Sequence, residues 1–279
     1  MFSEQHYTLE QVLDAVGLLK QEKGVDKILA SIKEKIFGND LNDENIEEFK
    51  VFVQDFTSMY YLMKKKFREK YRSTGERYFE HLRAVVNNVL ELPNPNTQKI
   101  LIAISHDCIE DTNIDFRTLN IIYGHEITLA VQAISKDSWE YYIATDNQHE
   151  DEKKKQAKDI RNKQYFGHLA SFDTFKKHIK DLAWSKGFEL SEEKIEEIAR
   201  NALDVKFADR IHNLSTQWDP NNLEQVRKKV NETKKYFLNI ARETNTEAYN
   251  KIQSFILILE VKINGTSKKV NTLLGNSVL

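Results

Sequence analysis

Apolar residues recur at intervals of three and four along most of the chain, which is the spacing that places them on one face of an α-helix. The three prolines lie in turn-like clusters at 93–95 and 220, so long helices are permitted elsewhere. Glycines number only nine and β-branched runs are short, which favours helices over strands. We therefore predict an all-α fold. The predicted helices cover residues 9–21, 44–71, 79–90, 97–111, 118–136, 164–170, 172–184, 192–213, 223–241 and 247–261.

Local signals predict where several helices begin. Thr8 and Gln11 form a capping-box pattern before the first helix. Asn42 or Asp43 is expected to cap the second helix, and Ser191 is placed to cap the helix at 192–213.

Two stretches depart from the regular pattern. Gly124 is expected to interrupt the helix at 118–136. Residues 135–159 lose apolar periodicity and gain charge, which predicts a solvated loop or the exposed start of a helix. Neither an internal repeat nor a low-complexity linker is present, so one helical domain with terminal additions is expected. We divide it into an N-terminal helical extension at 1–60, a core at 61–220 and C-terminal helices at 221–279.

Charge is balanced, with 41 Lys and Arg against 43 Asp and Glu and a formal charge of −2. Such a chain carries no basic field over its whole surface, so no nucleic-acid partner is expected and any anion site must be local. Without a run of 18 apolar residues or a signal core, we expect a cytoplasmic protein with no membrane contact. The single cysteine, Cys108, favours a reducing compartment. Homo-oligomerisation is left open.

Candidate chemistry concentrates in three segments, which contain His81, the pair His106–Asp107, and Asp209. A His-Asp pair inside a buried helix is costly unless the carboxylate is paired or bound to a cation, because an ionised group loses its hydration there. Imidazole nitrogen with carboxylate oxygen suits Mn²⁺, Fe²⁺ or Mg²⁺, whereas a structural zinc site requires thiolates that one cysteine cannot supply. The segments therefore favour a divalent metal site.

Helical spacing extends this interpretation. Residues four apart share a helix face, so His106 should lie under Glu110 and Asp107 under Asp111. These pairs predict two polar rows along one side of an otherwise apolar helix.

The third segment has the same spacing. Asp209 and Asn213 are four apart, and Lys206 precedes Asp209 by about one turn. A carboxylate, an amide and a cation should therefore line up on one face of this helix.

Four sequence strings, taken in order, resemble those of a known family. They read RSTGERYFEHL, AISHDCIEDT, IYGHEITLAVQAISK and VKFADRIHN, and they span roughly Arg72 to Thr216. The order H…HD…D resembles the HD-domain metal-dependent phosphohydrolases. The longer strings resemble one branch of that family, the hydrolase domain of the RelA/SpoT proteins that degrade the alarmone (p)ppGpp.

The resemblance implies a fold, a cofactor and a reaction. The fold would be an HD-domain helical bundle with extra N- and C-terminal helices. The reaction would be 3′-pyrophosphohydrolysis of (p)ppGpp to GDP or GTP and pyrophosphate. The cofactor would be one Mn²⁺ ion, and the residues that match its ligands are His81, His106, Asp107 and Asp209.

The resemblance also implies roles around the metal. Glu110 and Asp111 would position and deprotonate the attacking water or stabilise the charged site around it. Arg72 would pack on or bond to the nucleotide, and Asn213 would hold it near the ribose. Further nucleotide contacts match Lys136 and Thr216.

Three departures from the family pattern concern the substrate. Ser73 stands in place of a lysine, Arg77 in place of the proline before the tyrosine, and Leu82 in place of the proline after the metal histidine. A stretch at about 171–201 resembles an inserted helical hairpin. Because the residues after Asn213 form another helical stretch rather than a synthetase domain with strands, a stand-alone hydrolase is expected.

Two alternatives stay open from the sequence. An HD-type phosphohydrolase acting on another nucleotide, such as a nucleoside phosphate or NADPH, keeps the enzyme class and changes the substrate. A catalytically inactive helical interaction module is the alternative from a different class.

Overall fold

The computed structural model describes residues 6–18, 22–38, 41–143 and 150–275, with side chains to 266. Throughout these residues the secondary structure is helical apart from two isolated antiparallel bridges, Tyr7 with Leu41 and Tyr71 with Arg77. The predicted all-α fold is therefore confirmed. The chain divides into two compact units, residues 1–135 and 136–279. The three-part division into extension, core and C-terminal helices stays a prediction.

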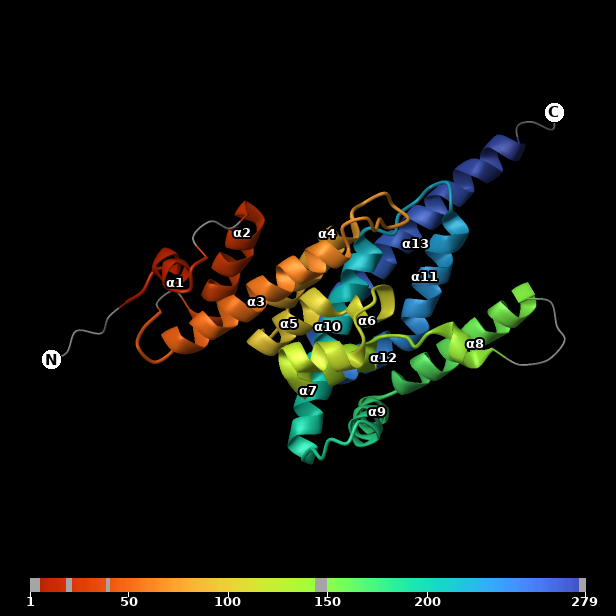
Figure 1. Cartoon of the computed structure of the whole chain (residues 1–279). Coiled ribbons are helices and arrows are strands. Elements are labelled where there is room, and N and C mark those ends of the chain that lie inside the picture. Colours follow the sequence, from red (N-terminus) through yellow and green to blue (C-terminus); the bar gives the residue numbers. More distant parts are fainter. Residues whose placement is uncertain (1–5, 19–21, 39–40, 144–149, 276–279) are drawn as a thin grey trace. The chain divides into compact units, whose positions relative to one another are not determined.

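The first unit contains eight elements within its described residues (Figure 1). They are α1 (Leu9–Ala15), α2 (Lys23–Ile32), the π-helix η1 (Lys33–Phe37), α3 (Ile46–Lys66), α4 (Tyr78–Leu90), α5 (Thr97–Ser105), α6 (Cys108–Asp111) and α7 (Phe116–Ile134).

Helix α5 is the centre of the first unit and packs against α3, α4 and α7. Every residue from Lys99 to Ser105 is buried. The Lys99 ammonium is satisfied because its Nζ donates to the carbonyl oxygen of Asn94 at 2.8 Å. An apolar helix surrounded by three others therefore supports the segment that follows it, which carries His106 and Asp107.

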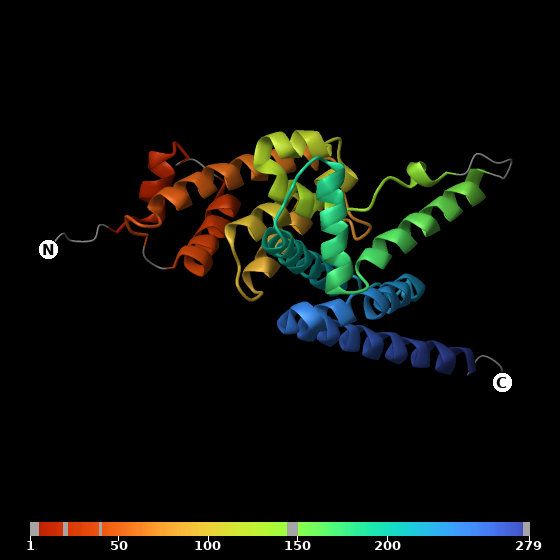
Figure 2. The same cartoon turned by 90° about the horizontal axis from the view of Figure 1, so that it is seen from below.

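Helix α10 (Glu192–Ser215, teal in Figure 2) is the centre of the second unit, and every residue in it from Val205 to His212 is buried. The described elements of the second unit are η2 (Trp139–Tyr142), a 3₁₀-helix, and the α-helices α8 (Glu150–His168), α9 (Phe172–Ser185), α10 (Glu192–Ser215), α11 (Leu223–Tyr236), α12 (Leu238–Thr244) and α13 (Thr246–Gly275). Helix α10 packs against α9, α11 and α13, and α12 packs against α11 and α13.

Several predicted helix signals are confirmed. Thr8 Oγ1 accepts from Gln11 N at 3.2 Å while the Gln11 side chain accepts from Thr8 N at 2.7 Å. Ser191 Oγ accepts from Lys194 N at 3.2 Å. Gly124 interrupts α7 with a φ of 77°, a left-handed value that glycine adopts without a steric cost.

The expected start of the second predicted helix is wrong. Helix α3 begins at Ile46, and the residue before it, Asn45, makes no side-chain capping bond. Asn42 instead closes the preceding turn, where its Oδ1 accepts from the backbone N–H groups of Glu44 and Asn45. Short polar side chains stabilise such turns as readily as helix caps, which explains the error. The prediction also missed α2 and η1, although the buried residues of α2, from Val25 to Ile32, have helical spacing.

Residues 135–159 contain both structures that the pattern allowed. A short 3₁₀-helix, η2, precedes α8, which begins at Glu150. Residues 144–149 of this segment lie outside the described residues. The stretch at 171–201 holds α9 and the start of α10, so it is helical as expected.

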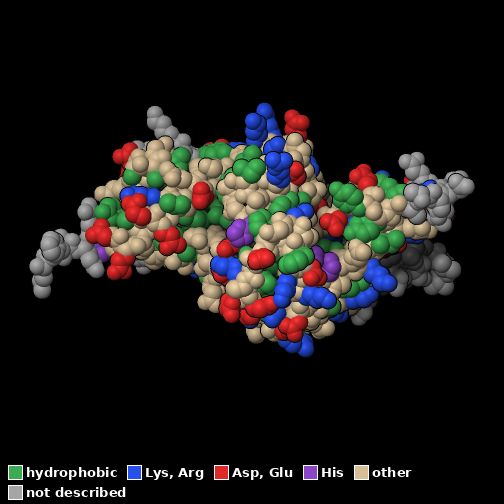
Figure 3. Space-filling model, turned by 60° about the horizontal axis from the view of Figure 1, so that its bottom comes forward, with side chains coloured by type: hydrophobic (Ala, Val, Ile, Leu, Met, Phe, Trp, Pro, Cys, Tyr) green, Lys and Arg blue, Asp and Glu red, His purple; other side chains and the backbone are tan. Residues whose placement is uncertain are grey.

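Surface charge follows the balanced composition. On the face shown in Figure 3, Lys and Arg side chains are interspersed with Asp and Glu side chains. In the part of the chain that the structure describes, none of the helices is long and apolar enough to cross a membrane.

Candidate metal centre

A tight hairpin leads into the helix that carries the first candidate ligand. Arg72 N donates to Glu76 O at 2.9 Å, and Gly75 provides the left-handed residue of the turn with a φ of 82°. Helix α4 then starts at Tyr78, which places Tyr78 and His81, three residues apart, on the same face.

The predicted continuous helix at 97–111 is wrong. Helix α5 ends at Ser105, and α6 begins at Cys108. Two side chains hydrogen-bond to carbonyl oxygens of the last turn of α5. Ser105 Oγ donates to Leu101 O at 2.7 Å, and His106 Nδ1 lies 2.8 Å from Ala103 O. Both side chains thus bond to carbonyl oxygens where the helix ends.

The break changes what His106 and Asp107 can do. Adjacent residues of a continuous helix point about 100° apart, so their side chains diverge. Here Asp107 has φ −101° and ψ 4°, and its Oδ2 lies 2.9 Å from His106 Nε2. The interruption therefore lets two consecutive side chains converge on one point.

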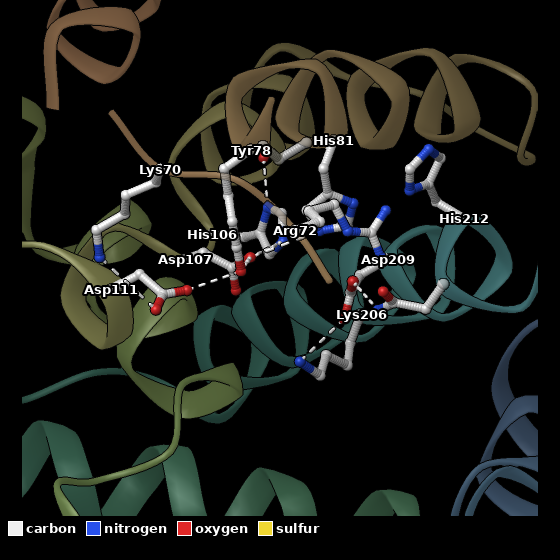
Figure 4. Close-up of polar contacts among 12 residues, drawn as sticks. Lys70, Arg72, Tyr78, His81, His106, Asp107, Asp111, Lys206, Asp209 and His212 are labelled. Carbon is white, nitrogen blue, oxygen red and sulfur yellow. Dashed lines mark hydrogen bonds and ion pairs between the residues drawn. The ribbon is translucent and has the colours of Figure 1, made fainter. Parts of the chain in front are cut away.

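His81 joins this pair from α4, as Figure 4 shows. Its Nε2 lies 3.5 Å from Asp107 Oδ2, and the ligand atoms of His81, His106 and Asp107 all lie within 4.8 Å of one another. Both histidines are buried, with 2% and 1% of their surface exposed. These three predicted ligands form one compact group that could hold a metal ion. We call them the metal cluster.

The donor set fits a divalent ion. The carbonyl of Ala103 only accepts, so His106 Nδ1 carries a hydrogen, and in the neutral imidazole Nε2 presents its lone pair to the Asp107 carboxylate. Two acceptor atoms 2.9 Å apart repel each other unless a proton or a cation lies between them. A divalent cation held by His81, His106 and Asp107 would remove this repulsion, so the three residues fit such an ion.

Tyr78, which the sequence interpretation did not select, bridges two of the predicted site residues. Its hydroxyl lies 2.9 Å from Asp107 Oδ2 and 2.7 Å from Asp111 Oδ2. Lys70 adds a cation 3.9 Å from Asp111 Oδ1. The position of Tyr78 three residues before His81 is the signal that could have found it.

Burial shapes the protonation of this group. Burial raises the pKa of Asp111 above its usual range, and the nearby Asp107 charge raises it further, against the lowering effects of Tyr78 and Lys70. Burial and both carboxylates raise the pKa of Tyr78, so its hydroxyl keeps its hydrogen. Burial raises the pKa of Cys108 to about 12, so this thiol keeps its hydrogen at neutral pH.

The fourth predicted ligand, Asp209, lies on α10 in the second unit. Lys206 Nζ lies 3.2 Å from Asp209 Oδ2, and Asn213 Nδ2 donates to Asp209 Oδ1. The predicted alignment of carboxylate, amide and cation is therefore confirmed. The place of Asp209 beside the metal cluster stays a prediction.

The other predicted residues are placed as follows. Glu110 lies on α6 and is exposed. Arg72 forms an ion pair with Glu76 at 3.4 Å in the hairpin. In the second unit, Lys136 Nζ lies over the Tyr165 ring at 5.3 Å, and Thr216 Oγ1 donates to the carbonyl of His212 at 3.0 Å. Their contacts with a nucleotide stay predictions.

Comparison with known proteins adds little to this geometry. No family model and no curated protein matches the chain. A solved structure of a metazoan ortholog of SpoT, described as hydrolyzing ppGpp and playing a role in starvation responses, is similar over 72% of this chain and 93% of that one. The sequence identity is 16% and the TM-score is 0.45, so this likeness identifies neither the family nor the activity.

Proposed function

We propose that the protein is a metal-dependent hydrolase of phosphate esters, and specifically a guanosine-3′,5′-bis(diphosphate) 3′-pyrophosphohydrolase with the fold of an HD-domain helical bundle. The single observation that carries the proposal is the metal cluster of His81, His106 and Asp107. Two imidazoles and one carboxylate leave further coordination positions for water and substrate, as a catalytic rather than a structural site requires.

The metal, which we propose to be Mn²⁺, supplies a positive charge that offsets developing charge on phosphate and lowers the pKa of water. Residues of the chain orient the water, accept its proton and bind the nucleotide. In this proposal Glu110 and Asp111 orient the attacking water and accept its proton. Arg72, on the hairpin before α4, binds the anionic nucleotide through its planar guanidinium.

The second unit contributes the remaining parts of the proposed site. Asp209 is the fourth ligand, and Asn213, one turn later on α10, binds the nucleotide near its ribose. Lys136 and Thr216 provide further contacts to the nucleotide. What supports these roles is the single polar face that Lys206, Asp209 and Asn213 form on α10.

A second candidate substrate is another nucleotide, such as a nucleoside phosphate or NADPH. Ser73 and Arg77 favour it, because they stand in the hairpin where the resembling family has lysine and proline. An inactive helical interaction module would need no metal, so metal binding discriminates it from both enzymes.

The proposal is tested in two steps on the full chain. Isothermal titration of metal-free protein with Mn²⁺ should give one site per chain. The Mn²⁺-loaded protein is then incubated with ppGpp, pppGpp, NADPH and deoxynucleoside triphosphates, and the released phosphate species are identified. We expect pyrophosphate with GDP from ppGpp. Orthophosphate alone, or hydrolysis of another nucleotide only, would support the second candidate, and absence of metal binding would support the interaction module.

A further inference from the structure

The geometry points to Tyr78 as a positioning residue that links the metal cluster to the acidic residue Asp111. This inference rests on the proposed function and concerns a residue that has no predicted role in the sequence analysis. We infer that the Tyr78 hydroxyl fixes the position of Asp111, which orients the attacking water in the proposed reaction, relative to Asp107, the metal ligand.

The hydroxyl geometry carries the first step. Tyr78 Oη lies 2.9 Å from Asp107 Oδ2 and 2.7 Å from Asp111 Oδ2, both within ordinary hydrogen-bond length. A hydroxyl carries a single hydrogen, so the two carboxylate oxygens share one donor. If either carboxylate moves, the hydrogen bond between Tyr78 and the other carboxylate changes as well. The positions of Asp107 and Asp111 are therefore coupled.

The ring of Tyr78 is itself fixed on two sides. It stacks on Phe67, with centroids 5.0 Å apart and planes 17° apart, and it meets His81 edge to face at 5.6 Å and 90°. Phe67 is 1% exposed at the end of α3. Lys70 Nζ lies over the Phe67 ring, 5.7 Å from its centre. A side chain held this way has little rotamer freedom left, so its hydroxyl is aimed before any ligand binds.

Tyr78 therefore contacts three of the predicted site residues at once. Its ring meets His81 edge to face, and its hydroxyl contacts Asp107 and Asp111 (Figure 4). Partners that hydrogen-bond to metal ligands fix the geometry of a site and are needed for full activity. By contrast, Glu110 lies on the exposed side of α6.

The test is Tyr78→Phe, which keeps the stacked ring and removes only the hydroxyl. We expect kcat for ppGpp to fall about tenfold to a hundredfold while KM changes less than threefold. Mn²⁺ titrated into metal-free variant should bind with one site per chain and an affinity reduced less than kcat is. The matched control is Tyr123→Phe, a half-buried tyrosine of the same unit whose hydroxyl donates to the Asp55 carbonyl at 3.4 Å. Its kcat should equal that of the wild type.

A structural role alone has a different signature. Phe67→Leu removes the ring beneath Tyr78 and should lower the melting temperature, whereas Tyr78→Phe should leave it within a few degrees of wild type. If Tyr78→Phe loses thermal stability in step with kcat, or keeps full kcat, Tyr78 is not a positioning residue. Failure of the wild-type protein to bind Mn²⁺ would instead overturn the proposed function, and the two failures are therefore distinguishable.

Discussion

The metal cluster of the first unit and the polar face of α10 in the second unit are built in different ways. His81 and the pair His106–Asp107 come from separate helices, and they meet because α4 packs on α5 and because α5 ends one residue before His106. Lys206, Asp209 and Asn213 all lie within one long helix, where spacing of three and four residues is enough to align them. The metal cluster therefore depends on tertiary packing, and the polar face of α10 on helix periodicity alone.

This difference predicts how each region responds to substitution. Changes near the metal cluster should act on several helices at once, because its ligands are held by a helix break and by Tyr78. Changes on α10 should stay local, since the helix is fixed by its buried residues on the other faces. The following predictions test that contrast, beginning with the largest expected effect.

Removing a metal ligand should break the cluster completely. We expect His106→Ala or Asp107→Ala to abolish Mn²⁺ binding and turnover, because each leaves a buried polar group without its partners. Isothermal titration and the phosphate-release assay measure the two effects. Asp209→Asn extends the test to the second unit and should have the same result if Asp209 is a ligand. Full activity in the variants of His106 and Asp107 would refute the metal centre.

The same contrast explains how far the sequence alone could go. The alignment of Asp209 and Asn213 could be predicted, because a long uninterrupted helix obeys the four-residue rule. That rule failed at His106, where α5 has ended and the Ser105 and His106 side chains bond to carbonyls of the preceding turn. From Asp107 onward it holds again, since Asp111 N donates to Asp107 O at 2.9 Å.

Tyr78 could be predicted only in part, because its place three residues before His81 puts it on the same face of α4 but does not reveal its hydrogen-bond partners. Its hydroxyl contacts residues 29 and 33 positions further along the chain, and no local pattern encodes such contacts. The π-helix η1 was missed together with α2, which it directly continues. Helix ends, as at Asn42, depend on which of several short polar side chains makes the capping bond.

The second prediction separates the role of Glu110 from that of a ligand. Glu110→Gln keeps the shape of the side chain and removes the charge that orients water. We expect kcat to fall about a hundredfold while Mn²⁺ affinity changes little. Titration calorimetry and steady-state kinetics on the same preparation give both values. If bound metal falls in step with activity, Glu110 is a ligand and belongs to the metal cluster.

The third prediction concerns pH and acts on the second unit only. His178 stacks on His168 with ring centroids 3.7 Å apart, and burial together with the His168 charge lowers the pKa of His178 to about 4, against the raising effects of Asp137 and Asp181. A histidine whose pKa is lowered by folding stabilises the fold above its ordinary pKa and loses that contribution as pH falls. We expect the free energy of unfolding to drop by about 2 kcal/mol between pH 7 and pH 5.

Urea unfolding of a paired variant checks this value. His178→Phe keeps a ring stacked on His168 and cannot be protonated, so its unfolding free energy should depend less on pH than that of wild type. His125→Gln, on α7 of the first unit, serves as the control and should leave the wild-type slope. An unchanged slope in His178→Phe would show that the stacked pair does not set the acid sensitivity.

The smallest expected effect compares one substrate contact from each region. Arg72→Lys on the hairpin and Asn213→Ala on α10 should each raise KM for ppGpp about tenfold, which is about 1.4 kcal/mol of binding, with bound Mn²⁺ unchanged. Lysine cannot reproduce the planar fork of arginine, and alanine offers no group to a ribose. Asn213 also donates to Asp209, so its variant tests the contrast most sharply. If Asn213→Ala weakens Mn²⁺ binding while KM is unchanged, Asn213 acts through the ligand, and the polar face of α10 belongs to the metal site rather than to the nucleotide site.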